Sequence, residues 1–216
     1  MMAYVWGVDS ASPANSSLLQ CVITNFGKPL YWGRYLSTVP GAADGLTTQE
    51  ISFLHGQNVK ILPIYNDFRQ AVGYENGKNA ARAAAGHAAR LGIARGTFLF
   101  ANIERFFKVD EAWIRGWVDT IRTSGYKSGM YHDPIHGPFS AAYCRAVSKD
   151  SRVKTESVLW SAEPERTVTG PQNAPAYAPY SPKCGGNVWG WQYGRDSKTC
   201  PIDTNLIDTR LYGQLF

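Results

Sequence analysis

Short apolar runs bounded by glycine, proline and polar residues recur along the chain, a pattern typical of buried strands. These runs predict strands at 4–8, 30–36, 59–65, 97–104, 127–131, 157–162, 188–193 and 201–207. Between the earlier strands, apolar residues recur at helical spacing, which predicts helices packed on the same core. The helices are expected at 16–25, 47–55, 77–91, 111–123 and 140–147.

The order of these elements indicates the fold class. Strands that alternate with helices favour a parallel sheet, because a parallel connection needs a crossover segment. Three strands without helices follow the five strand–helix units, since four prolines and three glycines in 169–187 exclude a regular helix there. We therefore predict an α/β protein, a TIM-type β/α barrel of five units closed by three further strands, with residues 1–216 forming one domain. Segment 169–187 is expected to lie over the mouth or the flank of the barrel.

Acidic residues stand where two of the predicted strands end. Asp9 follows the first strand, and Glu104 ends the fourth, two positions after Asn102. Side chains alternate between the two faces of a strand, so Asn102 and Glu104 point to the same side. The C-terminal ends of barrel strands carry the catalytic residues of β/α barrels, which makes both carboxylates candidates for chemistry. Helix capping is the structural alternative for each of them.

The composition narrows the function classes. With 216 residues, of which 44% are hydrophobic, the chain is long enough for one sizeable core. Its net charge of +5 comes from scattered residues without a Lys/Arg block, which disfavours nucleic-acid binding and is compatible with an anionic wall polymer. No apolar stretch is long enough to span a membrane, and no signal peptide is visible at the N-terminus.

The sequence carries no motif for a cofactor or a metal. No phosphate-binding loop of the G-x-x-x-x-G-K-[ST] kind occurs, so a nucleotide cofactor is not expected. His132 and Asp133 follow the fifth strand and could act as a base or as metal ligands. With four histidines in the chain and no H-x-x-x-H spacing, a zinc site is not expected.

The four cysteines also fit no zinc pattern. Cys184 and Cys200 bracket a glycine-rich turn and a strand, which permits a disulfide between them. Cys21 and Cys144 are about equally compatible with free buried thiols.

Several motifs, in this order along the chain, resemble those of a known family. G-V-D-S-A-S, Y-W-G-R-Y-L, I-L-P-I-Y and F-A-N-I-E are similar to the DUF1906 glycoside-hydrolase-like domains. L-W-S-A, W-Q-Y and I-D-T-N resemble the closing strands of the family 25 glycoside hydrolases, the lysozyme-type muramidases. The resemblance spans 6–207. It implies a barrel of five β/α units closed by three strands, with an acidic site that cleaves the glycan strands of peptidoglycan.

The resemblance also implies which residues form that site. The muramidase pattern has an Asp on the first strand, an Asp-x-Glu on the fourth and an Asp on the last, which match Asp9, Glu104 and Asp203, whereas Asn102 replaces the Asp of the fourth-strand motif. Glycoside hydrolysis needs an acid that protonates the leaving oxygen and a second group that stabilises the oxocarbenium-like centre. Glu104 is the candidate for the first role and Asp9 or Asp203 for the second. Asn102 could hold an acetamido group of the substrate.

Further residues near strand ends are candidates for substrate binding. Aromatic rings can stack on sugars, and the alternative for each is a place in the barrel core. Polar side chains can bind substrate groups, and the alternative is a structural hydrogen bond or ion pair. The candidates are Tyr65, Tyr131, Trp160, Trp191, Gln192 and Arg34, with Trp189 as a further aromatic.

We therefore expect a glycosidase that acts on peptidoglycan or another N-acetylated polysaccharide, as a monomer and without a cofactor or metal. A non-catalytic barrel that binds cell-wall glycans is the alternative, because Asn102 removes a charge from the family pattern. Both functions place the protein at the cell wall, whether secreted, periplasmic or delivered as a lysin or effector.

Overall fold

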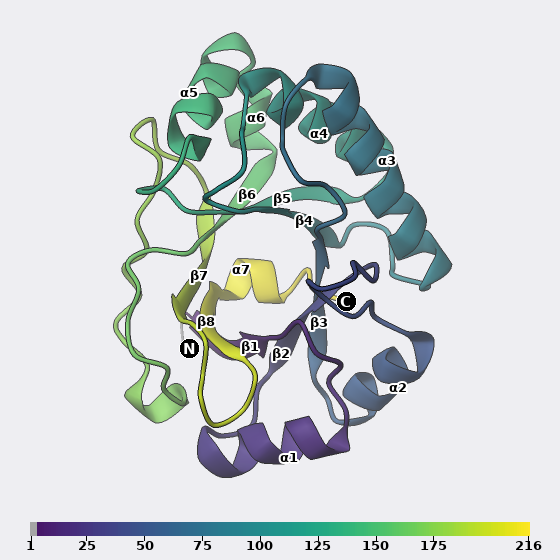
Figure 1. The fold of residues 1–216 in the computed structure, drawn as a ribbon, viewed down its shortest axis with the longest axis vertical. Helices are drawn as coiled ribbons and strands as arrows, with labels where there is room; N and C mark the ends of the chain where they lie inside the picture. The colour runs from purple at the N-terminus through teal and green to yellow at the C-terminus, as the bar shows by residue number, and fades with distance from the viewer. Residues whose placement is uncertain (1–3) are drawn as a thin grey trace.

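Eight strands form one closed barrel in chain order, which confirms the predicted fold class (Figure 1). The computed structural model describes residues 4–216, so residues 1–3, which the prediction about a signal peptide includes, lie outside the described part. The strands are β1 (Tyr4–Asp9), β2 (Tyr31–Tyr35), β3 (Lys60–Tyr65), β4 (Phe98–Ile103), β5 (Lys127–His132), β6 (Ser157–Ser161), β7 (Val188–Gly194) and β8 (Asp203–Asp208).

Most of the helices surround the barrel on its outer side (Figure 1). They are α1 (Ser16–Asn25), α2 (Thr48–Gly56), α3 (Tyr74–Arg90), α4 (Glu111–Thr123), α5 (Phe139–Lys149), α6 (Arg152–Thr155) and α7 (Thr209–Tyr212), with one 3₁₀ turn, η1 (Pro171–Asn173). The side chains of Asn15, Thr47 and Asp110 cap the N-termini of α1, α2 and α4. The short helices α6 and α7 are additional to the expected set, because four residues are too few to leave a periodic pattern. Within residues 4–216, no helix has the length and hydropathy needed to cross a membrane.

The last strand runs against the others. β1 to β7 are parallel, whereas β8 pairs antiparallel with both β7 and β1. The connection from Gly194 to Asp203 is too short for the crossover that a parallel strand needs, so the chain turns back directly. The first residue of β8, Asp203, therefore lies beside the last residue of β1, Asp9, as its register partner. The expectation of a parallel sheet from strand–helix alternation is confirmed for the strands that helices connect, whereas β8, which no helix precedes, runs antiparallel.

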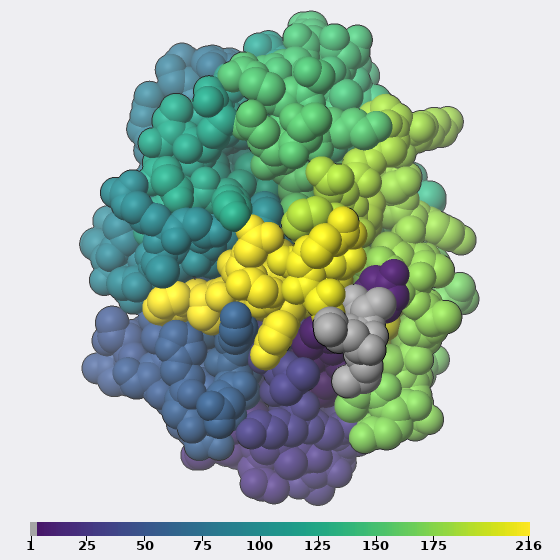
Figure 2. Space-filling view, turned by 180° about the vertical axis from the view of Figure 1, so that it is seen from behind, coloured from purple at the N-terminus to yellow at the C-terminus, as the bar shows by residue number. Residues whose placement is uncertain are grey.

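Side chains alternate between the barrel interior and the layer under the helices. In the interior, small and large residues face one another: a Cβ on Gly7 would lie 2.4 Å from the ring of Tyr31. Leu211 of α7 and Leu215 are buried in the same interior cluster as Tyr31. The C-terminal segment, yellow in Figure 2, lies across the face opposite the one seen in Figure 1. The C-terminal segment therefore closes the barrel interior at the amino ends of its parallel strands.

Segment 169–187 runs along the flank of the barrel between β6 and β7 (Figure 1). It is irregular apart from η1, as its prolines predict. Tyr177 stacks on Tyr4 with 4.0 Å between ring centroids, and its hydroxyl donates to the carbonyl of Val188 at 3.0 Å. The segment thus packs against the first residues of β1 and β7, on the part of the barrel wall that no long helix covers.

Two disulfides join distant parts of the chain. Cys21 of α1 is bonded to Cys200 in the β7–β8 connection, and Cys144 of α5 is bonded to Cys184 in segment 169–187. The expected Cys184–Cys200 pair is therefore wrong, and so is the free-thiol alternative for the other two cysteines. Strand β7 separates Cys184 from Cys200, and its seven residues span about 20 Å. Nearness in sequence was misleading because that strand carries the two cysteines to different ends of the barrel.

A buried ion pair connects β2 with α2. Arg34 is fully buried, and its Nε donates to Glu50 Oε1 at 2.6 Å. Its terminal nitrogens donate to the carbonyls of Ser10, Ala11 and Asp44. Arg34 therefore ties the β1–α1 and β2–α2 connections to the barrel wall, and its charge is paired and hydrogen-bonded as a buried charge must be.

Replacing Arg34 by methionine should destabilise the fold strongly, because Glu50 would remain as a buried, unpaired carboxylate. Removing one partner of such a pair costs about 3–5 kcal/mol in the free energy of unfolding. Equilibrium unfolding in guanidinium chloride measures the loss. Arg152→Met is the matched control, since the ion pairs of Arg152 lie at the surface, and its midpoint should stay close to that of the parent. An Arg34→Met protein as stable as the parent would show that the pair is dispensable.

Candidate active site

A cavity of about 300 Å³ opens at the mouth of the barrel, where the parallel strands end. This volume is at the lower end of the range typical of small-molecule sites. Asp9, Glu104 and Asp203 all line the cavity, so the two acidic residues at strand ends and the third that the family resemblance indicated lie together. Four of the expected substrate-binding residues also line it, namely Asn102, Tyr131, Trp160 and Gln192.

Gln192 of β7 links two of the carboxylates. Its Nε2 lies within hydrogen-bond distance of both oxygens of Asp9, at 3.3 and 3.1 Å, and of Oδ2 of Asp203, at 3.0 Å. Its Oε1 accepts a hydrogen bond from the hydroxyl of Tyr131 at 2.7 Å, which sets the orientation of the amide. Asn205 of β8 donates a further bond to Asp9 at 2.6 Å. One amide group therefore holds the two carboxylates together.

Burial controls the protonation of this pair. Removal from water raises the pKa of Asp9, while the hydrogen bonds from Asn205 and Gln192 favour its ionised form. Burial raises the pKa of Asp203 as well, and the adjacent charge of Asp9 raises it further, against the backbone N–H of Asp196 at 2.7 Å. Burial and mutual repulsion thus act in the same direction, so the pair keeps a proton at pH values at which isolated aspartates are ionised.

Glu104 lies directly after β4 and faces the same cavity. The Nδ2 of Asn102 donates to Glu104 Oε1 at 3.0 Å, as their two-residue spacing allows. Burial raises the pKa of Glu104 above its ordinary value, while the Asn102 bond and the charges of Arg195 and Arg105 act in the opposite direction. A carboxyl group with a raised pKa keeps its proton toward neutral pH, which is the property that a general acid needs.

Aromatic rings line the cavity, and a glycine beside Asp9 leaves room for the Asp9 side chain. The ring of Trp160 packs edge-to-face on Tyr131 with 5.0 Å between centroids, and Tyr35 adds a third ring to the lining. On β2, next to Asp9, a Cβ on Gly33 would lie 2.6 Å from the Cβ of Asp9. Glycine at this position therefore leaves the space that the Asp9 side chain occupies.

Three of the expected substrate-binding residues lie away from the cavity. Arg34 belongs to the buried ion pair described above, and Tyr65 packs between the barrel and the helices against Trp117. Trp191 is 1% exposed, and its Nε1 donates to a backbone carbonyl. Each of the three stands at a strand position whose side chain points outward, so the prediction of substrate binding is corrected to a structural role. Trp189 is the second residue of β7 and lies near the opposite end of the barrel, against Phe98.

The sequence from residue 29 to residue 179 matches the family model described as the Rv2525c-like, glycoside hydrolase-like domain. The chain belongs to this family. No curated protein matches the sequence.

Solved structures with this fold include a near relative of the chain. A crystal structure of an uncharacterized B. stearothermophilus protein is 54% identical, with a TM-score of 0.97 over 98% of this chain and 100% of that chain. The catalytic domain of endolysin ply40 from bacteriophage P40 of Listeria monocytogenes is 18% identical, with a TM-score of 0.60 and coverages of 99% and 96%. A family 25 glycosyl hydrolase from Bacillus anthracis is 14% identical, with a TM-score of 0.56 and coverages of 96% and 90%. The last two share the fold, and the resemblance drawn from the motifs is confirmed at the level of family and fold.

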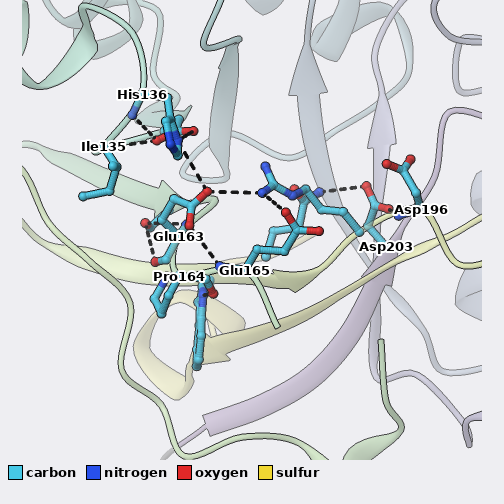
Figure 3. Close-up of polar contacts among 12 residues, drawn as sticks. Ile135, His136, Glu163, Pro164, Glu165, Asp196 and Asp203 are labelled. Atoms are coloured by element: carbon cyan, nitrogen blue, oxygen red, sulfur yellow. Dashed lines mark hydrogen bonds and ion pairs between the residues drawn. The ribbon is translucent and has the colours of Figure 1, made fainter. Parts of the chain in front are cut away.

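In this glycoside hydrolase-like domain, paired charges border one side of the cavity (Figure 3). Arg195 donates to Glu163 Oε1 at 3.2 Å and also pairs with Glu165. The Nδ1 of His136 lies 3.0 Å from Asp133 Oδ2 and 3.8 Å from Glu163 Oε1. Within residues 4–216, Asp133, His136 and Glu163 form the one group whose ligand atoms lie close enough for a metal ion, within 4.8 Å of one another. Asp133 accepts hydrogen bonds from the backbone N–H groups of Ile135 and His136, and Glu163 accepts one from Arg195.

Sequence analysis missed several residues that complete the site. Asn205 follows Asp203 by two positions in the I-D-T-N motif, so strand alternation alone could have assigned both to one face. Tyr35 also lines the cavity and was missed, because the sequence does not tell whether Tyr35 or the adjacent Arg34 points inward. Arg195 and Asp196 lie in the β7–β8 connection, which has no periodic pattern, and no sequence signal indicated them.

Replacing Asp203 by asparagine should make the stability of the protein less dependent on pH. A carboxyl group whose pKa is raised by folding contributes stability below its unfolded pKa and loses that contribution as the pH rises through the folded pKa. For Asp203 this window runs from the ordinary value of 3.8 to about 8. Because Asp203→Asn lacks the titrating group, its melting temperature relative to the parent should increase across this window.

Thermal unfolding across the window measures the effect, and 1 kcal/mol corresponds to about 2–4 °C for a protein of this size. An offset that is the same at every pH would reflect only altered hydrogen bonds. Asp150→Asn is the control, because hydrogen bonds from Arg152 lower the pKa of Asp150, so this group titrates below the window and the offset between the variant and the parent should stay nearly constant across it. A difference between parent and Asp203→Asn that does not vary with pH would contradict the raised pKa.

Proposed function

We propose that this protein is a glycoside hydrolase that cleaves the glycan strand of bacterial peptidoglycan, with Glu104 as the general acid. The observation that carries the proposal is the meeting of Asp9, Glu104 and Asp203 in one cavity at the mouth of the barrel. β/α barrels keep their catalytic groups at this end. Membership of a glycoside hydrolase-like family supports the same reaction class.

Glu104 supplies the proton that the leaving group needs. Its pKa is raised by burial, and Asn102 orients its carboxyl group through the bond to Oε1. The proton passes to the glycosidic oxygen as the bond to the anomeric carbon breaks, and positive charge develops on the sugar ring. As a carboxylate, Glu104 then accepts a proton from the water molecule that completes the hydrolysis.

Asp9 is the group best suited to stabilise the developing positive charge. Its three contacts with side-chain amide hydrogens favour the ionised form in spite of its burial. In an N-acetylated sugar, the acetamido oxygen can itself attack the anomeric carbon, and the protein then orients that group. Asp203, held next to Asp9 by Gln192, is the candidate for orienting it.

Peptidoglycan is the proposed substrate because the order of the motifs resembles the muramidases and because an endolysin domain and a family 25 hydrolase share the barrel. The two disulfides support a site of action outside the cytoplasm, since disulfides persist in oxidising surroundings. We therefore infer that the protein acts at the cell wall.

Asn102 favours a second candidate function, a non-catalytic barrel that binds wall glycans. Its amide donates to Glu104 and so favours the ionised form, which opposes proton donation. An amide also supplies no charge to a developing cation. The same cavity would then hold a glycan without cleaving it.

Glu104→Gln separates the two candidates. The variant keeps the shape of the side chain but has no proton to donate, so the release of reducing ends from purified peptidoglycan should fall by about 10²-fold or more. Sedimentation with wall sacculi should show unchanged binding. Glu156→Gln, in a surface ion pair with Arg122, is the matched control and should cleave like the parent. Equal cleavage by Glu104→Gln and the parent would exclude Glu104 as the acid, whereas a parent that binds sacculi but never cleaves would favour the binding barrel.

Asn102→Asp should shift the pH dependence of cleavage. The substitution replaces a hydrogen-bond donor to Glu104 by a second carboxylate, and both changes raise the pKa of Glu104. The alkaline limb of the pH–rate profile should therefore move to higher pH. Asn102→Ser, which alters the amide donor without adding charge, should produce a smaller shift. An alkaline limb that stays in place or moves down in Asn102→Asp would contradict the assignment of that limb to Glu104.

A further inference from the structure

Two exposed apolar side chains stand at the mouth of the barrel. Phe106 is 75% exposed and Ile135 is 57% exposed, more than any other large hydrophobic residue in 4–216. They belong to the β4–α4 and β5–α5 connections. Phe106 also lines the cavity that contains Glu104. Single exposed apolar side chains are common on protein surfaces, but Phe106 stands at the rim of a polar cavity, which makes it a candidate ligand contact.

The chain holds Phe106 on a supported turn. The N–H of Phe107 donates to the carbonyl of Glu104 at 3.0 Å, which closes a turn around Phe106. The ring of Phe107 packs edge-to-face on the ring of Phe106 with 5.1 Å between centroids. In the neighbouring connection, a Cβ on Gly137 would lie 2.2 Å from the carbonyl oxygen of Arg105, so the two connections are in direct contact. These contacts therefore hold the turn that carries Phe106 in place, two residues after the proposed general acid Glu104.

We propose that the ring of Phe106 is the stacking platform of a sugar subsite beside Glu104, occupied by a hexopyranose ring of the bound glycan. This inference rests on the proposed function and adds to it a residue that recognises the substrate. A pyranose ring carries its hydroxyl and amide groups at the edge and C–H groups on its faces. The face of an aromatic ring carries partial negative charge and attracts such C–H groups, in addition to the apolar area that the contact buries.

The surroundings of Phe106 favour a sugar over an apolar partner. Six carboxyl groups and two guanidinium groups line the same cavity. A lipid chain or an apolar protein surface would desolvate these groups without offering hydrogen bonds, which is unfavourable. A sugar ring can hydrogen-bond to them at its edge while one of its faces covers Phe106. Because Phe106 adjoins the acidic cavity, a sugar ring is the ligand that suits both the aromatic ring and the polar groups beside it.

Binding to an inactive protein tests the subsite directly. The background is Glu104→Gln, and the probe is a tetrasaccharide of alternating N-acetylglucosamine and N-acetylmuramic acid. In isothermal titration calorimetry, Phe106→Ala should bind about five- to tenfold more weakly, the size of one lost aromatic contact. Phe106→Trp should bind within about twofold of the background protein, because indole also offers an aromatic face.

Tyr180→Ala is the matched control. It removes another exposed ring, 48% exposed, from the segment on the flank of the barrel, and it should leave the Kd unchanged. Because Phe106 is largely exposed, the melting temperature of Phe106→Ala should equal that of the background protein. Equal affinity of Phe106→Ala and the background protein would overturn the subsite.

Cleavage assays in the wild-type background distinguish failure of the subsite from failure of the proposed function. Cleavage by the parent with unchanged kcat/KM in Phe106→Ala would overturn the subsite and leave the hydrolase standing. Weaker binding by Phe106→Ala, together with no cleavage by the parent, would support the subsite and overturn the hydrolase. A protein that neither binds nor cleaves the tetrasaccharide would overturn both.

Discussion

The burial of two carboxylates side by side is the constraint on which this site depends. Asp9 and Asp203 are register partners on β1 and β8, and they meet only because β8 runs antiparallel to its neighbours. Two charges at this position would repel each other in surroundings that already disfavour charge, so the pair retains a proton. Gln192 and Asn205 donate hydrogen bonds to Asp9, which favours its ionised form, and burial opposes this effect. The result is a pair of carboxyl groups with raised pKa values beside Glu104, whose pKa burial also raises, and glycoside hydrolysis needs an acid with such a raised pKa.

The rim around this pair is tied to the helices on both sides. Arg34 connects the loops that follow β1 and β2 to the barrel wall, through its bonds to Glu50 and to backbone carbonyls. On the other side, the Cys21–Cys200 disulfide anchors the connection that leads into β8 to helix α1. Loops at a barrel mouth are short of packing partners, so these two ties limit how far the carboxylates can move apart. None of these residues needs to touch a substrate to matter for the site.

Prediction from the sequence succeeded for features that depend on residues close together in the chain. Apolar periodicity reports which side of a strand or helix is buried, and it located all eight strands and the five longer helices of the described chain. The same reasoning placed Asp9 and Glu104 at the mouth, because parallel strands bring their carboxyl ends together. The hydrogen bond from Asn102 to Glu104 also follows from a two-residue spacing within one strand.

The sequence by itself therefore determined the strands and helices, their closure into a barrel and most of the acidic site. The tertiary structure decided the direction of β8, the pairing of the cysteines and which side chains of each strand face the barrel interior. Trp191 and Gln192 are adjacent in a strand and must face opposite sides, yet the sequence could not tell which one points inward. In a β/α barrel both the interior and the layer under the helices are apolar, so hydrophobicity does not distinguish the two faces, and outward-pointing Arg34 and Tyr65 were misassigned for the same reason. The antiparallel direction of β8 and the partners of Cys184 and Cys200 depend on contacts between segments far apart in the chain. Such contacts are set by the packing of the whole barrel, which no local pattern records.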